Sequence, residues 1–478
     1  MKKHTMINLD ERKVPHGLKP AKGADARRTS NGLDAIRPDT AGIDVGSTEM
    51  WVAVPEGLGC PSVRRFGAFT EDLRAMSAWL KGIGIKHIAM ESTGVYWIPP
   101  FEMLQSDGFE VVLVNARHVK CVPGRPKTDK HDSQWLRRLH ACGLLNPSFR
   151  PSEKVCRLRA VKRCGENFVR DAATQVQRMQ KSLHQMNIQL DKVISDITGA
   201  TGRRIIEAVI AGERDLGRLA DKRDPQVKAS RETIMKALEG NYRAEHVFSL
   251  RLAHEAYQFN TAKALECDRE AASILEDMAN KLAASTAIDE QPLPERPVSS
   301  LSENKRQAPP DTATKAWLRQ LLGVDLTAVP GIGVDTALRL VAELGTDFSK
   351  WPTASHFASY LGLCPDLRIS NSLVKGHKTR KVPTRVPRAL RLAAQSLHHS
   401  GTALGAFLRR MKSKLGGRKA VTAAAHKLAV IIYKMVTTGK EFVELGGDYY
   451  DRLHRSRAVK SLRRRAQAMG FELVEKAA

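Results

Sequence analysis

Acidic side chains are missing from a long part of this 478-residue sequence. Residues 367–440 contain 17 lysines and arginines but no aspartate or glutamate, and the whole chain carries a formal net charge of +26. A solvated protein surface normally mixes both signs of charge, so this stretch favours contact with a polyanion such as a nucleic acid. An anionic membrane is the alternative. We find neither a long apolar span nor a lipidation signal, and therefore expect no membrane association.

The sequence also has few cysteines and no recognisable export signal. Its seven cysteines form no Cys-x-x-Cys pair, so they give no support for a zinc site. Because no signal-peptide pattern is present, we expect a cytoplasmic protein with reduced thiols. Aromatic residues make up only 5%, but hydrophobic residues at 42% suffice for globular packing, and the length predicts two to four domains.

Hydrophobic periodicity and composition divide the chain into six predicted segments. A polar start without periodicity indicates disorder, and five prolines within residues 291–310 indicate a linker. The predicted segments are a disordered basic arm that contacts nucleic acid (1–39), an α/β domain (40–150), a helical, coiled-coil-like region (151–285), a proline-rich linker (286–312), a mostly α-helical domain (313–445) and a basic tail (446–478).

The α/β domain is predicted from alternating strand and helix patterns. The segments AGIDVGS and EMWVAVPE predict a β-hairpin that turns at Gly46 and Ser47. The segment EDLRAMSAWLKGIG has the apolar period of a helix, and KHIAMES and FEVVLVNA have the character of short strands.

Residues 158–190 carry apolar side chains at intervals of three and four, with one phase slip. This pattern is typical of a coiled-coil-like seam that contains a stutter. Two interpretations stay open, an intramolecular helical hairpin and an arm through which two copies dimerise. The seam positions are Leu158, Val161, Gly165, Phe168, Ala172, Val176, Met179, Leu183, Met186 and Leu190.

The segment LTAVPGIGVDTALRLVAELG has the pattern of a helix-hairpin-helix motif. Gly331 and Gly333 permit a tight turn ahead of a helix, where backbone N–H groups can face a phosphate. A plain helical hairpin is the structural alternative. Because the motif stands directly ahead of the acid-free stretch, we favour contact with a nucleic-acid backbone.

Four carboxylates stand at positions suited to metal chemistry. Asp44 and Glu91 each end a predicted strand, and the carboxyl ends of adjacent parallel strands form sites at one edge of a sheet. Asp129 and Asp132 are three residues apart at a predicted helix start, which puts both on one helix face. Carboxylates brought together raise one another's pKa unless a cation neutralises them, and oxygen ligands suit Mg²⁺ or Mn²⁺. A pair of such ions can activate a nucleophile in phosphoryl transfer.

Each acid also has a structural explanation when it is taken alone. Asp132 fits a helix N-cap, Asp129 fits a turn, and Glu91 fits the exposed end of a strand. The ordered set of four on the expected elements is what favours a metal site.

In this order, the motifs GIDVGS, MESTGVYW and KTDKHDSQWL resemble the DEDD transposases of bacterial insertion sequence family 110. These proteins are site-specific recombinases guided by a bridge RNA. The segment from VPGIGVDTALRLVAELG to SLVKGHKTRK resembles their C-terminal transposase domain. The resemblance covers residues 40–145 and 320–440, with a helical segment between them as in the family.

The resemblance implies an RNase H-like, RuvC-like N-terminal domain whose four acids bind Mg²⁺. It also implies a serine nucleophile that forms a transient 5′-phosphoserine link to DNA. The family motif GLxP followed by a serine, matched to GLCPDLRIS, assigns this role to Ser370. Asn371 stands where a glycine is usual, and Ser372 is the alternative nucleophile.

The resemblance further implies an active site shared between protomers, with acids from one copy and the serine from another. Such sites belong to a dimer or tetramer assembled on donor DNA, target DNA and a bridge RNA, in the bacterial cytoplasm at the nucleoid. Basic side chains around Ser370 are suited to hold the scissile phosphate. They are Arg368, Lys375, Lys378, Arg380 and Lys381.

Three other functions stay open at this point. GIDVGST also resembles the phosphate loop of sugar kinases and actin-like ATPases, although no second phosphate motif and no adenosine motif follow it. The second alternative is a Mg²⁺-dependent nuclease or junction resolvase that uses water and forms no covalent intermediate. The third is a non-catalytic basic protein that binds nucleic acid.

Overall fold

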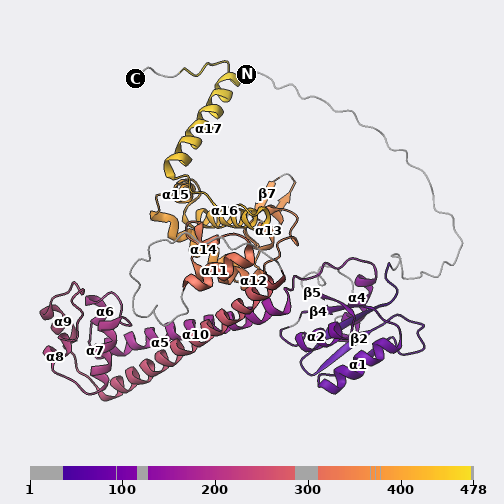
Figure 1. Cartoon of the computed structure of the whole chain (residues 1–478), viewed down its shortest axis with the longest axis horizontal. Coiled ribbons are helices and arrows are strands. Elements are labelled where there is room, and N and C mark those ends of the chain that lie inside the picture. The colour runs from indigo at the N-terminus through magenta and orange to yellow at the C-terminus, as the bar shows by residue number, and fades with distance from the viewer. Residues whose placement is uncertain are drawn as a thin grey trace, which may run out of the picture. The chain divides into compact units, whose positions relative to one another are not determined.

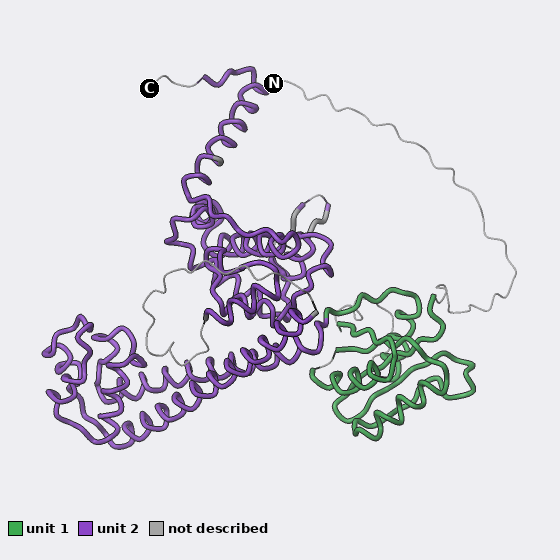
Figure 2. Tube along the Cα trace, viewed as in Figure 1, with its two compact units in different colours: residues 1–149 green, residues 150–478 purple. Residues whose placement is uncertain are grey.

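The structure is a computed structural model of the chain (Figure 1). It describes residues 36–92, 94–115, 128–285, 311–365, 368–371, 373–376 and 378–474. The chain divides into two compact units, residues 1–149 and 150–478 (Figure 2). Residues 1–35 of the predicted arm, residues 286–310 of the predicted linker, and Ser372 lie outside the described residues.

A mixed five-stranded sheet forms the centre of unit 1, in the order β3-β2-β1-β4-β5. β1 pairs antiparallel with β2 and parallel with β4, and β4 pairs parallel with β5. Gly46 N–H donates to Glu49 O at 2.9 Å, which closes the predicted hairpin between β1 and β2. The strands are β1 (Thr40–Val45), β2 (Glu49–Ala53), β3 (Val63–Gly67), β4 (His87–Glu91) and β5 (Glu110–Val114).

Helices cover both faces of this sheet. α1 (Thr70–Gly82) and α2 (Ile98–Ser106) share an apolar core with one face, where Ile43 and Ile88 are buried. α4 (Asp129–Ala141) packs on the other face, where its Leu136 contacts the cluster of Ala89 and Val114. The central strands are therefore apolar on both faces, which is why they appear in the sequence as short continuous hydrophobic runs.

A long helical hairpin opens unit 2 (Figure 1). α5 (Glu153–Gln185) and α10 (Ala244–Ser285) pack along one another, and seam side chains such as Leu158 and Met179 are buried between them. A Cβ atom at Gly165 would lie 3.0 Å from Cys267 Cβ, so glycine permits the close approach of the two helices. Within this chain the seam is an intramolecular contact, the first of the two interpretations.

The seam pattern overruns the end of α5. The helix ends at Gln185, and Asn187 takes a left-handed backbone conformation with φ of 62°. Met186 and Leu190 instead join the core of a small helical lobe at the tip of the hairpin. Apolar spacing alone cannot distinguish a helix from a turn that buries the same side chains. The lobe contains α6 (Leu190–Val193), α7 (Ala200–Ile210), α8 (Leu216–Ala220) and α9 (Arg231–Leu238).

The rest of unit 2 is mostly helical, as predicted, with one short β-hairpin. Within the segment predicted as a helix-hairpin-helix, the second half forms α12, but the first half forms only the 3-10 turn η2, and the helix ahead of it, α11, ends at Leu322. The elements are α11 (Asp311–Leu322), η2 (Leu326–Ala328), α12 (Val334–Leu344), α13 (Ala354–Tyr360), β6 (Arg368–Ser370), β7 (Leu373–Gly376), α14 (Val386–Ser396), η3 (Leu397–His399), α15 (Ala403–Leu415), α16 (Gly417–Thr438) and α17 (Gly447–Ala468).

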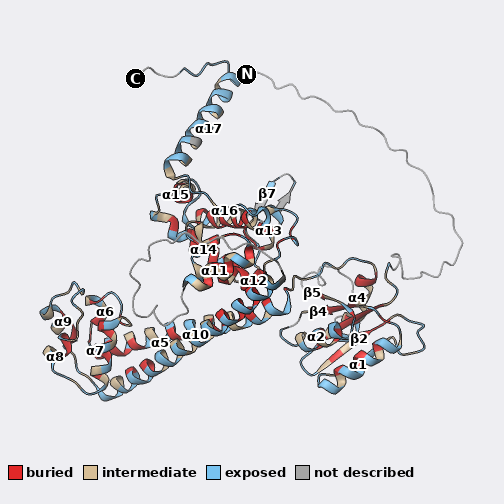
Figure 3. Cartoon of the chain, in the orientation of Figure 1, coloured by how far each residue is buried: buried red, intermediate tan, exposed pale blue. Residues whose placement is uncertain are grey.

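Two helices near the C-terminus correct the sequence predictions. In the described part of the chain, α16 is the one helix long and apolar enough to cross a membrane by length and composition, where we expected no such span. Its apolar face packs against α13, α14 and α15 through Ala424, Leu428 and Ile432, so packing accounts for its composition. The predicted basic tail contains the helix α17, whose residues are mostly exposed (Figure 3).

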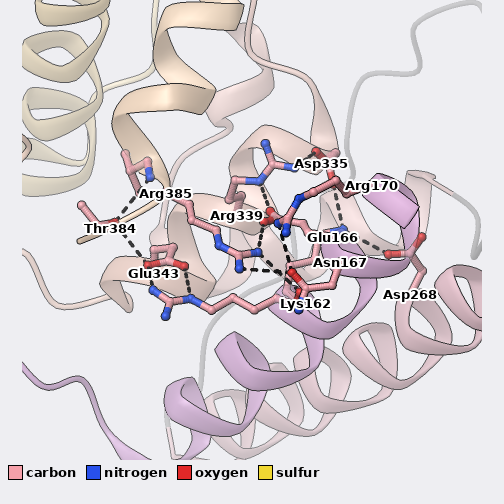
Figure 4. A network of polar contacts seen from close by, with 12 residues as sticks. Lys162, Glu166, Asn167, Arg170, Asp268, Asp335, Arg339, Glu343, Thr384 and Arg385 are labelled. Carbon is pink, nitrogen blue, oxygen red and sulfur yellow. Dashed lines mark hydrogen bonds and ion pairs between the residues drawn. The ribbon is translucent and has the colours of Figure 1, made fainter. Parts of the chain in front are cut away.

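A network of ion pairs joins α5 to α12 and to the start of α14 (Figure 4). Arg163 holds the carboxylate of Glu343 through two hydrogen bonds of 2.7 Å, and Thr384 Oγ1 donates to the same carboxylate at 3.2 Å. Arg385 pairs with Glu166, one helical turn along α5. The network therefore fixes the base of the helical hairpin to the helices that follow it.

Candidate active site

Asp44 and Glu91 lie next to one another on adjacent strands. β1 and β4 are parallel, and Ile43 lies opposite Met90, so Asp44 and Glu91 are the next residues of the two strands. Both acids stand at the carboxyl-terminal end of their strand. The structure thus brings these two predicted residues together at one edge of the sheet.

The two acids also point to the same face of the sheet as α4. Side chains alternate along a strand, so Asp44 shares its face with Gly42, and Glu91 shares its face with Ala89. Ala89 belongs to the cluster that packs against α4. A Cβ atom at Gly42 would overlap the backbone of Ser133 and Arg137 in α4. Glycine at this position therefore allows α4 to lie directly against β1.

The first turn of α4 carries the other two acids. Thr128 Oγ1 accepts a hydrogen bond from His131 N–H at 3.3 Å and caps the helix, so Asp129 and Asp132 follow as first-turn residues. The structural explanation of Asp132 as an N-cap is therefore wrong. Because α4 contacts β1 through Gly42, its first turn comes near the end of that strand.

The electrostatics of Asp44 show that all four carboxylates share one environment. Burial raises the pKa of Asp44 to about 6, and the negative charges of Glu91, Asp129 and Asp132 add to this increase. A backbone hydrogen bond from Val45 acts in the opposite direction. Three like charges thus act on Asp44 in a partly desolvated position, where its ionised form is unfavourable unless a cation compensates.

The donor set consists of oxygen atoms, the ligand type that Mg²⁺ and Mn²⁺ take. Within the described residues, no three Asp, Glu, His or Cys side chains lie close enough together to hold a metal ion. The other three carboxylates are therefore near enough to influence the pKa of Asp44, although no three of the four are close enough together to hold a metal ion. Their chemistry fits a divalent cation.

Ser370 is the last residue of β6, and it pairs with Leu373 of β7. The turn between the strands includes Asn371, which takes a left-handed conformation with φ of 50°. Glycine adopts this conformation most easily, and asparagine is among the few other residues that tolerate it. The departure from the glycine usual in the resembling family is therefore compatible with the same turn.

The residues predicted to contact nucleic acid are distributed around this hairpin and at α12. Lys378 and Lys381 are exposed, whereas Arg380 donates to Ser359 O at 3.0 Å and so also holds the end of α13. Arg368 and Lys375 lie on β6 and β7. All of these belong to unit 2, while the four acids belong to unit 1.

The two glycines of the predicted phosphate turn have different structural roles. Gly331 has φ of 85°, and a Cβ atom there would lie 2.6 Å from Ala393 O in α14, so packing alone accounts for glycine. Gly333 is the N-cap of α12 and has open space around it. Asp335 places a negative charge in the first turn of the same helix and pairs with Lys162 at 2.8 Å. That charge opposes the binding of a phosphate at this helix terminus.

Comparison with known proteins gives first a class and then a family. Residues 41–188, which include all four acids, match a sequence model of DEDD transposases, described as a transposase. Residues 325–408, which include Ser370, match the model described as the transposase IS116/IS110/IS902 family. Two separate segments of the chain are thus similar to transposases of this family. This result decides against the kinase-like interpretation of the GIDVGST loop, which forms a plain hairpin turn.

A curated relative supports the same family. It is the insertion element IS110 uncharacterized 43.6 kDa protein of Streptomyces coelicolor, and it is 34% identical over 90 residues. The alignment covers 19% of this chain and 22% of the relative, so the chain spans about a fifth of the length of the relative that it matches.

Sequence reasoning missed residues that position the site. Gly42 stands in the motif AGIDVGS and was not singled out, because its importance depends on which helix crosses β1. The spacing Gly-x-Asp places Gly42 on the same strand face as Asp44. This spacing was the sequence feature that could have indicated a close helix contact beside the acid. Thr128, which caps α4 ahead of Asp129, was also not singled out.

Proposed function

We propose that this protein is a DNA transposase of an insertion sequence, which cuts and rejoins strands of donor and target DNA. The observation that carries this proposal is that the charges of three carboxylates, from β4 and the first turn of α4, all act on Asp44 at the end of β1. The similarity of residues 41–188 and 325–408 to transposases supports the same activity. The sheet order and the antiparallel β2 agree with an RNase H-like, RuvC-like domain.

Asp44, Glu91, Asp129 and Asp132 would hold one or two Mg²⁺ or Mn²⁺ ions. When bound, such ions supply charge stabilisation and lower the pKa of an attacking hydroxyl group. The protein contributes the position of the ligands. β1 and β4 fix Asp44 and Glu91 on a rigid sheet, and the close contact at Gly42 holds the first turn of α4 nearby.

Ser370 is the proposed nucleophile. Its Oγ attacks the scissile phosphorus, its proton leaves to solvent or base, and the 3′ oxygen of the broken strand departs as a hydroxyl group. The 5′ end remains joined to Ser370 as a phosphoserine, and a 3′ hydroxyl group later displaces the serine when the strands are rejoined. Ser370 ends β6 beside the turn at Asn371, and Lys378, which follows β7 and is exposed, is suited to bind the phosphate.

We further propose that the active site is composite, and that a bridge RNA selects the DNA. The acids and Ser370 belong to different compact units, which suits a site assembled from two copies. The hairpin helix α10 exposes Phe248, Leu252 and Phe259, with exposed fractions of 53%, 47% and 58%. Exposed large apolar side chains on one helix are suited to contact a second copy in a dimer or tetramer.

A nuclease or junction resolvase that uses water is the second candidate. It is favoured by one observation, namely that unit 1 contains all four acids and needs no residue of unit 2 for metal-dependent hydrolysis.

Trapping of a protein–DNA adduct distinguishes these two functions. The wild-type chain, incubated with donor DNA, its co-purified RNA and Mg²⁺, is expected to form an adduct that survives denaturing electrophoresis. Ser370→Ala is expected to abolish the adduct, and Ser400→Ala serves as a control on a serine outside the hairpin. Cleavage that persists in Ser370→Ala without any adduct would support the nuclease. An adduct that persists would point to Ser372.

A further inference from the structure

A hollow between α14, α15 and α16 is lined by basic, apolar and neutral polar residues and by no acid. Its volume is about 600 Å³. Three helices supply its basic groups, with Arg391 on α14, Lys412 on α15 and Arg418 on α16. Three positive charges converging without a carboxylate in the lining repel one another, and an anion would relieve that repulsion.

The start of α16 adds further hydrogen-bond donors to this hollow. Gly416, the N-cap of α16, provides no side chain to cap the helix, and Gly417 and Arg418 line the hollow directly. The first backbone N–H groups of a helix have no acceptor within the helix, and the helix dipole is positive at this end. Backbone donors and guanidinium groups together suit the oxygen atoms of a phosphate.

The position of Lys412 is fixed by a histidine. Lys412 Nζ donates to His398 Nε2 at 2.9 Å, so the imidazole accepts and is neutral. The charge of Lys412 lowers the pKa of His398, with further contributions from burial, His399 and Arg409. His398 is held in turn by Arg409, which donates to His398 O at 3.2 Å and to Ser400 O at 2.7 Å. The ammonium group is thus oriented and not merely exposed.

Apolar residues form the other part of the lining. Leu408 and Ala420 are buried in the floor, and Val421 is half-buried beside them. A site for a free inorganic ion needs no such surface, whereas a sugar or a base does. A duplex is too wide for a hollow of about 600 Å³, but one nucleotide fits within it.

We propose that the hollow between α14, α15 and α16 binds one unpaired nucleotide of a nucleic-acid strand. Arg391, Lys412, Arg418 and the N-terminus of α16 hold its phosphate, and Val421 contacts its sugar or base. This site is separate from the β6–β7 hairpin, and it rests on the proposed function only in that the partner is a nucleic acid.

The test is the affinity of the full chain for a short single-stranded oligonucleotide, measured by fluorescence anisotropy. The double variant Lys412→Gln/Arg418→Gln removes two charges that line the hollow. The matched control Lys414→Gln/Lys427→Gln removes two exposed charges from the same two helices outside the lining. We expect the first variant to bind about tenfold more weakly. The slope of its log binding constant against log salt concentration should decrease in magnitude by roughly 0.7 for each lost phosphate contact. The control should change little in both respects. Equal weakening of both variants would overturn the proposal.

A second variant fills the hollow without changing any charge, which covers the case that the double variant fails to fold. Val421→Phe is expected to weaken binding of the single strand and to leave binding of blunt duplex DNA unchanged. Adenosine 5′-monophosphate is expected to compete with the oligonucleotide for the wild-type chain, and adenosine is not. Full single-strand affinity in Val421→Phe would contradict the proposal. Equal competition by adenosine would also contradict it. Measurements with DNA and RNA oligonucleotides identify which strand the site prefers.

The binding assay also separates this site from the proposed function. Asp44→Asn is expected to abolish strand cleavage and to retain single-strand affinity, since Asp44 lies in the other unit. If cleavage survives in Asp44→Asn, the metal-site proposal fails, while the oligonucleotide results still decide whether the hollow binds a nucleotide.

Discussion

At the scale of the single residue, Gly42 determines where the acids of α4 lie. The helix contacts β1 so closely that any side chain at Gly42 would overlap the backbone of Ser133 and Arg137. Backbone atoms cannot move aside as the end of a flexible side chain can. The position of Asp129 and Asp132 relative to Asp44 therefore depends on the absence of a Cβ atom at residue 42.

Gly42→Ala is predicted to force α4 away from the sheet. Overpacking of this kind costs roughly 1–3 kcal/mol of unfolding free energy, and here it also separates the carboxylates. Urea unfolding of the full chain measures the stability. Gly82→Ala is the control, since a Cβ atom at Gly82 has open space, and this change is expected to be neutral or slightly stabilising. Equal effects of the two substitutions would contradict the role given to Gly42.

Asn371 gives a second prediction at this scale. Because its φ is 50°, Asn371→Gly should leave the β6–β7 turn and the serine adduct intact. Asn371→Val should disfavour the turn by about 1–2 kcal/mol and reduce adduct formation, since a β-branched residue rarely takes this conformation. The yield of trapped adduct for both variants is the measurement. A fully active Asn371→Val would show that the turn geometry is not needed.

The four acids were predicted from their order and from the elements that carry them, and Ser370 only from the family resemblance. The structure places Asp44 and Glu91 on adjacent parallel strands. The separation of the four side chains could not be predicted, because it depends on how α4 packs against the sheet. The sequence also predicted that Gly331 belongs to a turn that contacts a phosphate, whereas in the structure Gly331 packs closely against α14. A sequence alone cannot distinguish a glycine that is needed for close packing from one that is needed for the approach of a ligand.

At the scale of the element, the ion pair between Arg163 and Glu343 joins the helical hairpin to α12. The Glu343 side chain is only 4% exposed. Burial raises the pKa of its carboxyl group, but the hydrogen bonds and charges of Arg163 and Arg159 outweigh this effect and leave the pKa below the ordinary value. The ionised form of Glu343 therefore stabilises the folded state.

Glu343→Gln is predicted to destabilise unit 2 by about 2–4 kcal/mol, because it leaves Arg163 without a counter-charge at the junction. The pH dependence follows from the lowered pKa. The stabilisation by Glu343 is present above its ordinary value of 4.5 and is lost as the pH falls through the folded value. Thermal unfolding between pH 3 and 7 should show that the wild-type chain loses more stability at low pH than Glu343→Gln does. The two losses of unfolding free energy should differ by about 1 kcal/mol or more. Identical profiles would contradict this assignment.

Element boundaries show the limits of periodicity. The apolar spacing through residue 190 predicted a longer seam, but α5 ends at Gln185, where the chain turns into the helical lobe. The basic tail gave no apolar period, and its helix α17 is mostly exposed. Periodicity detects a buried stripe, so it misses an exposed helix and it continues across a turn that buries the same residues.

At the scale of the whole molecule, the acid-free stretch and the candidate metal ligands lie in different units. The acid-free residues 367–440 lie in unit 2, and the four candidate metal ligands lie in unit 1. Composition alone could predict the basic character of residues 367–440, because charged residues can be counted without knowledge of the fold. It could not predict the hollow between α14, α15 and α16, whose lining comes from helices brought together by packing.

The central claim is that Asp44 belongs to a metal site that cuts DNA, and metal-dependent cleavage by Asp44→Asn tests it most directly. Strand cleavage of donor DNA is measured at increasing Mg²⁺ and Mn²⁺ for the wild-type chain, for Asp44→Asn and for the control Glu71→Gln, an exposed acid of α1. Loss of a metal ligand should lower activity by about 100-fold or more at all metal concentrations, while the control retains wild-type cleavage. Cleavage by Asp44→Asn at the wild-type rate would contradict the claim.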